Sequence, residues 1–271
     1  MIIDGKAIAA QILERAHADA QSLPHTPSFV AFVVAPEGAT RSYLKVKARQ
    51  AAQAGIRMEV RELPLESTTE AVIDAVTTAP EDAVIVQLPL PPHIDMMRVL
   101  EAIPEEKDAD VLSPVARMHG SVMHPIAASV KHILEIGAVP VSGARAVVVG
   151  EGWLVGQPVA AWLREAGADV RTVTKESGDL REAAPLAQIL VSGAGAPGII
   201  TPELVAEGAA VIDVGTSELG GSIAGDVAPE VSERAGLFTP VPGGVGPIAV
   251  AYLMQNVVSL ARLRNADNGV H

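Results

Sequence analysis

The stretch that most constrains this fold runs from Ala146 to Pro158, AVVVGEGWLVGQP. Its small and β-branched apolar residues end at Gly150, which predicts a buried strand, and glycines recur at 152 and 156 before an amphipathic run. Glycines at a strand-to-helix turn let the backbone approach a pyrophosphate, and the helix N-terminus supplies free N–H groups and a positive dipole end. The spacing G-x-G-x-x-x-G is one residue longer than the usual dinucleotide fingerprint. A tight turn without a ligand therefore stays an alternative.

The second half of the chain alternates between apolar runs and helical segments. Strands are expected over 145–149, 169–173, 188–191 and 210–214, with helices starting near 155, 180 and 202. Such a β-α-β series predicts a mostly parallel, Rossmann-like sheet with helices on both faces. Ligands bind at the carboxyl ends of strands in these sheets, and the glycine-rich turns at 150–156, 193–195 and 215 all fall there. A nucleotide site at this edge is the prediction.

The first half of the chain predicts another α/β lobe. Strands are expected over 28–35, 57–63 and 82–88, and helices over 4–23, 40–54, 68–78, 96–102 and 126–136. Glycines 137 and 143 bound a natural hinge, and a final helix is expected from 248 to about 263. We therefore expect two lobes, one of residues 1–139 plus 246–271 and one of residues 140–245.

Composition narrows the possible functions. A formal net charge of −12 argues against a nucleic-acid surface, and 3% aromatic residues argue against base stacking. The absence of cysteine excludes disulfides and thiolate ligands, and the seven histidines form no ligand spacing, so we expect no metal. No apolar run has the length of a membrane span, and the first residues do not read as a signal peptide. We expect a cytoplasmic protein that binds neither nucleic acid nor membrane.

A few polar residues of the first half could carry chemistry. Tyr43 and Lys47 are four residues apart and share a helix face, where a desolvated lysine can act as an acid or base. A solvated lysine on an amphipathic helix is the alternative. Gln87 ends a buried strand and points either into a cleft or to neighbouring backbone. Asp108 and Asp110 follow in a loop that is either a buried carboxylate site or a solvated acidic segment.

These pieces together resemble the bifunctional methylenetetrahydrofolate dehydrogenase/cyclohydrolase family. The matching segments, in family order, are Ser42–Lys47, Val86–Pro91, Pro104–Asp110, Val148–Pro158, Ile212–Gly215, Gly225–Val227 and Thr239–Pro247. The last of them, TPVPGGVGP, is a signature of that family, and the resemblance covers nearly the whole chain.

The resemblance implies oxidation of 5,10-methylenetetrahydrofolate with a nicotinamide cofactor, then hydrolysis of the methenyl product to 10-formyltetrahydrofolate. It implies that Lys47 is the acid/base group of the hydrolysis and that Gln87 helps set its protonation. Tyr43 would pack on the folate rings, and Asp110 would bind the pterin N–H edge. The remaining substrate-binding positions would be Leu88, Pro242, Gly243 and Gly246. A homodimer that pairs through its nucleotide lobes is also implied.

The cofactor positions carry the clearest departure from the family. The implied cofactor-binding residues are Gly150, Glu151, Gly152, Gly156, Lys175 and Thr216. Where the family has Arg-Ser, groups that hold the 2′-phosphate of NADP, this chain has Glu151-Gly152. Two hypotheses follow: NADP is retained and held by Lys175, or NAD is preferred because its 2′-hydroxyl can donate to Glu151.

The folate side departs as well. Val111 stands where the family has glycine after Asp110, and further differences occur at Met123-His124 and Ile248-Ala249. Two rival hypotheses remain: a relative of shikimate dehydrogenase, which shares the two-lobe plan but lacks the TPVPGGVGP loop, and a non-catalytic folate or nucleotide binder.

Overall fold

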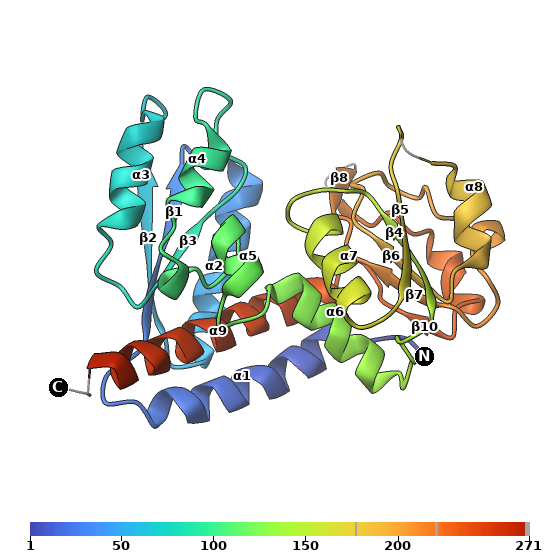
Figure 1. Ribbon diagram of the computed structural model, residues 1–271, viewed down its shortest axis with the longest axis horizontal. Coiled ribbons are helices and arrows are strands. Elements are labelled where there is room, and N and C mark those ends of the chain that lie inside the picture. The colour runs from blue at the N-terminus through green and yellow to red at the C-terminus, as the bar shows by residue number, and fades with distance from the viewer. Residues whose placement is uncertain (177, 220–221, 269–271) are drawn as a thin grey trace. The chain divides into compact units, whose positions relative to one another are not determined.

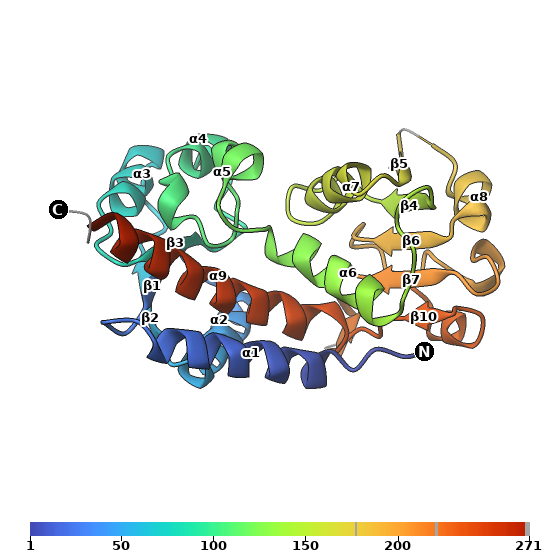
Figure 2. The same cartoon turned by 60° about the horizontal axis from the view of Figure 1, so that its bottom comes forward.

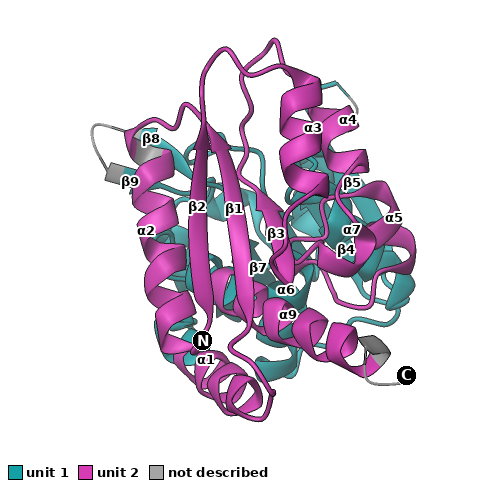
Figure 3. Cartoon of the chain, turned by 90° about the vertical axis from the view of Figure 1, so that its left-hand side faces the viewer, with its two compact units in different colours: residues 1–9, 126–249 teal, residues 10–125, 250–271 magenta. Residues whose placement is uncertain are grey.

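A computed structural model describes residues 1–176, 178–219 and 222–268, and its backbone contacts divide the chain into two compact units (Figure 3). One unit comprises residues 10–125 and 250–271, and the other residues 1–9 and 126–249. These bounds differ from the expected 139/140 and 245/246. The first residues join the unit of residues 126–249 because Ile3 N–H donates to Phe238 O at 2.9 Å and Gly5 N–H to Gly243 O at 3.0 Å. Pairing across more than 200 residues leaves no local signal in the sequence.

The unit of residues 10–125 and 250–271 contains a parallel three-stranded sheet in the order β2-β1-β3 (Figure 1). Every residue of β1, Ser28–Val34, is buried, as expected for an apolar central strand. Residues of β2, Arg57–Leu63, are exposed or half-buried because β2 is an edge strand. The other elements are α2 (Gly38–Gln53), α3 (Thr69–Thr77), β3 (Ala83–Val86), α4 (Met96–Glu101), η1 (Glu105–Lys107) and α5 (Pro114–His119). Helices α1 (Gly5–Gln21) and α9 (Val245–Asn268) contribute most of their length to this unit.

The unit of residues 1–9 and 126–249 contains a parallel five-stranded sheet in the order β10-β7-β6-β4-β5 (Figure 2). Its strands are β4 (Arg145–Val149), β5 (Asp169–Val173), β6 (Ile189–Ser192), β7 (Ala210–Asp213) and β10 (Leu237–Phe238). Its helices are α6 (Pro125–Ile136), α7 (Gly156–Glu165) and α8 (Leu180–Ala183), and its 3₁₀ turns are η2 (Ala184–Leu186), η3 (Pro202–Leu204) and η4 (Pro229–Glu233). Strands β8 (Ser217–Leu219) and β9 (Ser222–Ala224) pair as a short antiparallel ribbon. The core includes Val147, Val149, Leu190, Val211 and Phe238. Helices flank the parallel sheets, so the predicted α/β class is confirmed.

Long apolar strands were predicted to within one or two residues, but several short elements were not. No element was predicted over residues 114–119, where helix α5 lies, although Ser113 followed by Pro114 is a helix-start signal: the Ser113 Oγ accepts from Ala116 N–H at 3.1 Å. The helix expected from 202 is wrong, because η3 is a single 3₁₀ turn. Strand β10 is only two residues long, too short for a periodic pattern.

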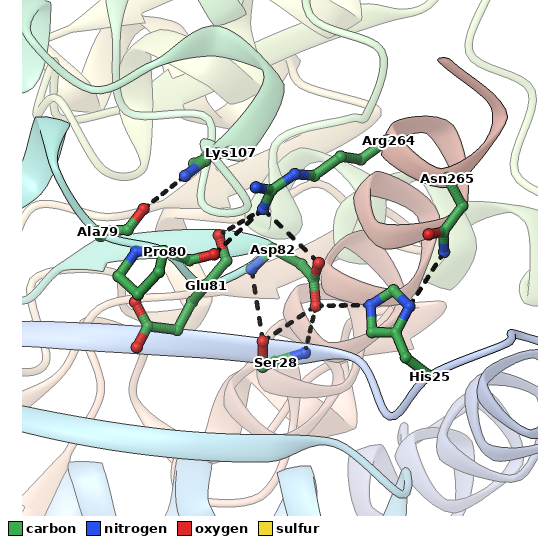
Figure 4. Close-up of polar contacts among 9 residues, drawn as sticks. All are labelled: His25, Ser28, Ala79, Pro80, Glu81, Asp82, Lys107, Arg264 and Asn265. Carbon is green, nitrogen blue, oxygen red and sulfur yellow. Dashed lines mark hydrogen bonds and ion pairs between the residues drawn. The ribbon is translucent and has the colours of Figure 1, made fainter. Parts of the chain in front are cut away.

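Asp82 joins the end of α9 to the first strand (Figure 4). Its carboxylate is 7% exposed and accepts from Ser28 N–H at 2.9 Å and from the Ser28 hydroxyl at 3.0 Å. His25 Nε2 lies 3.1 Å away, and Arg264 Nη1 lies 3.7 Å from the other oxygen while donating to Glu81 O at 3.0 Å. A buried carboxylate with several donors anchors the last turns of α9 to the sheet.

Replacing Asp82 with alanine is expected to lower the free energy of unfolding by about 2–4 kcal/mol, since it leaves the Ser28 N–H without its acceptor and Arg264 without its ion-pair partner. Urea denaturation measures the loss. Asp74→Ala, at an exposed position of α3, is the control and is expected to change stability by less than about 0.5 kcal/mol. Equal stability of the two variants would contradict the anchoring role.

Candidate active site

Lys47 is a buried amine surrounded by three polar or aromatic side chains. It is 3% exposed, and its Nζ donates to Gln87 Oε1 at 3.1 Å. Its Nζ lies 3.8 Å from Asp110 Oδ2 and 5.0 Å from the centre of the Tyr43 ring. The structure thus brings together all four residues predicted as catalytic, and a solvated Lys47 is wrong.

The topology of the sheet explains this convergence. In the order β2-β1-β3, the chain leaves β1 toward one side and β3 lies on the other, so β1 and β3 flank a topological switch point. Helix α2 follows β1 and carries Tyr43 and Lys47 one turn apart. Gln87 follows β3 directly, its N–H donates to Phe32 O at 2.8 Å, and its Nε2 donates to Leu88 O at 2.8 Å. The hydrogen bond to the Leu88 carbonyl thus orients the side-chain amide of Gln87.

Burial sets the protonation of the lysine. Desolvation lowers the pKa of Lys47, while the carboxylate of Asp110 raises it and only partly offsets that effect. A larger fraction of the amine is therefore neutral than in an exposed lysine. Desolvation and the charge of Asp110 both raise the pKa of Tyr43, which is 41% exposed, so its phenol keeps its proton at neutral pH. Lys47 is the group of this cluster suited to accept a proton.

The loop that carries Asp110 is built on a second, buried carboxylate. Asp108 is 1% exposed and accepts from Leu112 N–H at 3.1 Å and Ser113 N–H at 2.7 Å. Desolvation raises the pKa of Asp108 to about 6. A parallel bridge from Asp108 to Val84 places the loop beside β3. Asp108 is structural, whereas Asp110 keeps 22% of its side chain exposed and is available to a ligand.

Val111 and Asn256 also hold this loop. Val111 is buried with φ +54°, a left-handed conformation that is unfavourable for a β-branched residue, and it stands where the family resemblance expects glycine. Asn256 of α9 donates from Nδ2 to Ala109 O at 2.8 Å and to Met123 O at 2.9 Å. Asn256 was not predicted, although an amide residue within a mostly apolar helical stretch was a usable signal.

His124 is a buried imidazole. It is 7% exposed, and desolvation together with the positive charge of Arg117 lowers its pKa to about 3. The imidazole is therefore neutral at physiological pH.

The glycine turn of the other unit is shaped by steric demands at two positions. Gly150 has φ +97°, and a Cβ there would lie 2.8 Å from Gly193 O. A Cβ at Gly156 would lie 2.1 Å from Gly150 O, so neither position admits a side chain. A Cβ at Gly152 would meet nothing within 4 Å. The backbone therefore does not require glycine at 152.

This turn lies where a dinucleotide binds in open parallel sheets. The order β10-β7-β6-β4-β5 reverses between β4 and β6, and the turns after these strands touch at Gly150 and Gly193. Helix α7 begins at Gly156, and its N-cap residue, Val155, makes no side-chain capping bond. The N-terminal N–H groups and the helix dipole suit a pyrophosphate.

The remaining predicted ligand residues divide between the two compact units. Glu151, Lys175 and Thr216 are exposed in the unit of the glycine turn. Leu88 is half-buried beside Gln87. Pro242, Gly243 and Gly246 belong to the unit of residues 1–9 and 126–249, so they do not share a compact unit with Lys47.

Two negative findings apply to the described ranges, 1–176, 178–219 and 222–268. No group of three or more His, Asp or Glu side chains is placed to hold a metal ion there. No helix in these ranges combines the length and apolar character needed to cross a membrane.

Comparisons with known proteins agree over nearly the whole chain. Residues 3–110 match the family model "Tetrahydrofolate dehydrogenase/cyclohydrolase, catalytic domain", and residues 125–265 match its "NAD(P)-binding domain". The bifunctional protein FolD of Methanospirillum hungatei is 39% identical over 97% of this chain and 98% of its own length. The crystal structure of the Campylobacter jejuni bifunctional enzyme FolD superposes with a TM-score of 0.91 at 31% identity, covering 97% of this chain and 99% of that one.

A Trypanosoma brucei methylenetetrahydrofolate dehydrogenase-cyclohydrolase, solved with NADP and an inhibitor, also superposes with a TM-score of 0.91, at 33% identity over 98% of each chain. Shikimate dehydrogenase of Thermus thermophilus reaches a TM-score of 0.52 at 17% identity, covering 89% of this chain and all of that one, a likeness of fold alone.

Proposed function

The chain belongs to the tetrahydrofolate dehydrogenase/cyclohydrolase family, and from this we propose how its own residues divide the two reactions. The enzyme oxidises 5,10-methylenetetrahydrofolate with a nicotinamide cofactor and hydrolyses the methenyl product to 10-formyltetrahydrofolate. The hydrolysis is assigned to the Lys47 cluster and the cofactor to the glycine turn. The observation that carries the proposal is the buried Lys47 amine within hydrogen-bond reach of Gln87.

Lys47 acts as the base of the hydrolysis. Its neutral amine takes a proton from the water that attacks the methenyl carbon, and the ammonium then returns a proton to N5 as the carbon–N5 bond breaks. The second proton of the water passes to solvent, which balances the charge of the methenyl cation. The Lys47 amine donates a hydrogen bond to Gln87 Oε1 at 3.1 Å, so the lone pair of the lysine nitrogen points away from the Gln87 amide.

Tyr43 and Asp110 position the folate. Tyr43 is 41% exposed, and an accessible aromatic side chain can stack on the folate ring system. Asp110 offers a partly exposed carboxylate to the amino and ring N–H groups of the pterin, a charge-assisted pair. We assign Leu88, Pro242, Gly243 and Gly246 to the folate site on the resemblance.

Hydride transfer needs no acid or base from the protein, since the enzyme's contribution is to hold the donor and acceptor carbons in line. We assign Gly150 and Gly156 to the pyrophosphate and Thr216 to the same site. We propose that NADP is the cofactor, with Lys175 contacting its 2′-phosphate, and that discrimination against NAD is weak because Glu151 repels that phosphate.

We further propose that the enzyme is a homodimer, as the family resemblance implies, and that it is cytoplasmic, as expected from its sequence.

Replacing Lys47 with alanine is expected to reduce methenyltetrahydrofolate hydrolysis by at least about a hundredfold, because the general base is removed. Cofactor affinity should change less than about twofold, since the proposal assigns the cofactor to the glycine turn and not to Lys47. The loss of methenyl absorbance measures hydrolysis. Lys45→Ala, at an exposed position of the same helix, is the control, and undiminished hydrolysis in Lys47→Ala would reject the assignment.

Replacing Gln87 with glutamate places a carboxylate beside the amine and is expected to raise the pKa of Lys47 by at least about one unit. The neutral fraction at pH 7 falls, so hydrolysis slows about tenfold or more and the acidic limb of its pH–rate profile moves to higher pH. Gln53→Glu makes the same chemical change at the exposed end of α2 and should leave the profile unmoved. A limb that stays in place, or moves to lower pH, is inconsistent with Lys47 acting as the base.

The double change Glu151→Arg with Gly152→Ser is expected to raise the ratio of kcat/KM for NADP over NAD by about tenfold or more, because it restores a positive group and a hydroxyl at the 2′-phosphate. The open space around Gly152 admits the serine side chain. Glu165→Arg, at the far end of α7, has the same effect on net charge and is the control. A large NADP preference in the unaltered enzyme would refute the repulsion assigned to Glu151.

A further inference from the structure

Asp226 is a fully buried carboxylate that receives donors from the loop after β6. Its Oδ2 accepts from the Ser192 hydroxyl at 2.7 Å, from Ala194 N–H at 2.7 Å and from Gly195 N–H at 3.2 Å. Its Oδ1 accepts from Ala196 N–H at 2.7 Å. An ionised carboxylate accepts only, so four donors match its charged form.

The loop held by these bonds, residues 193–196, packs against the glycine turn. It follows β6 at the carboxyl edge of the sheet, and its Gly193 O lies 2.8 Å from where a Cβ of Gly150 would be. A Cβ on Gly193 itself would lie 2.3 Å from the Val155 side chain, just before α7. A small displacement of this loop would therefore alter the space beside Gly150 and the start of α7.

The direction of these hydrogen bonds also determines where the carbonyl groups of the loop point. Because peptide units are planar and trans, N–H groups turned toward Asp226 direct the carbonyls of residues 193–195 the opposite way. Gly193 O consequently faces the Gly150 turn. The carboxylate thus fixes which polar groups the loop presents on its outer side.

Asp226 is itself held by a second buried carboxylate. Asp213, at the end of β7, is 1% exposed and accepts from Asp226 N–H at 3.2 Å, Val227 N–H at 2.9 Å and Gly215 N–H at 3.0 Å. Burial raises the pKa of Asp213 to about 6. Hydrogen bonds from backbone N–H groups to these two carboxylates thereby connect β7, residues 226–227 and the loop after β6.

We propose that Asp226 is a positioning residue for the nicotinamide cofactor: without touching it, its charge holds residues 194–196 in the orientation that completes the site beside Gly150. This rests on the proposed function, in which the dinucleotide occupies the glycine turn. The oxidation therefore depends on Asp226, and the hydrolysis at Lys47, in the other compact unit, does not.

The test is Asp226→Asn, an isosteric change that removes the charge and turns an amide nitrogen toward N–H donors. The KM and calorimetric Kd for the cofactor are expected to rise about tenfold, and kcat/KM for oxidation to fall about ten- to a hundredfold. Methenyl hydrolysis should stay within about twofold, a split that general unfolding cannot produce. Ser192→Ala is the matched control: it removes one 2.7 Å bond to the same carboxylate but none to the loop, and should cost oxidation less than about threefold.

Two outcomes would overturn the proposal: equal loss of both activities in Asp226→Asn, or an unchanged affinity for the cofactor. Absence of both activities in the unaltered protein would instead count against the proposed function, while calorimetry with NADP or NAD would still test Asp226.

If Asp226→Asn does not fold, hydrogen exchange in the unaltered protein decides. The amides of residues 194–196 should be protected without cofactor, because the carboxylate already holds them. Amides that exchange freely and become protected only when NADP binds would show that the cofactor orders the loop, and would contradict the proposal.

Discussion

The chemistry of this protein depends on keeping an amine out of water. Lys47 is buried with one hydrogen bond to Gln87, and the carboxylate of Asp110 lies 3.8 Å away, near enough to attract the charge but not to form a close ion pair. Desolvation outweighs this attraction, so the pKa of the lysine falls. A closer carboxylate would fix the charge and end the amine's use as a base. The geometry is a balance between two opposing electrostatic effects.

The other compact unit meets a different demand, a backbone that must come close to a ligand. Gly150 and Gly156 provide that approach, and the side chains of Asp226 and Asp213 hold the adjoining loops. Each unit therefore buries charged side chains next to its proposed site, Lys47 in one and Asp213 and Asp226 in the other, and supplies hydrogen-bond partners for them. In the unit of Lys47 the buried group reacts, whereas in the unit of the glycine turn the buried carboxylates hold backbone at a site where a ligand binds.

The sequence was sufficient where the signal is local. Apolar runs located most of the strands, helical spacing placed Tyr43 and Lys47 on one face, and the strand end placed Gln87. Contacts between distant segments could not be predicted this way: Asn256 holds the carbonyl of Ala109, 147 residues away, and Asp226 holds a loop some 30 residues before it. The positive φ of Val111 could not be predicted either, because valine is a residue type that rarely adopts this conformation.

The most direct test of this account is the pKa of Lys47 itself. An NMR titration of the protein with labelled lysine, with the signal assigned by comparison with Lys47→Arg, should give a pKa below the ordinary 10.5. A pKa for Lys47 at or above 10.5 would mean that the attraction of Asp110 outweighs burial, and the lysine could not serve as the base of the hydrolysis.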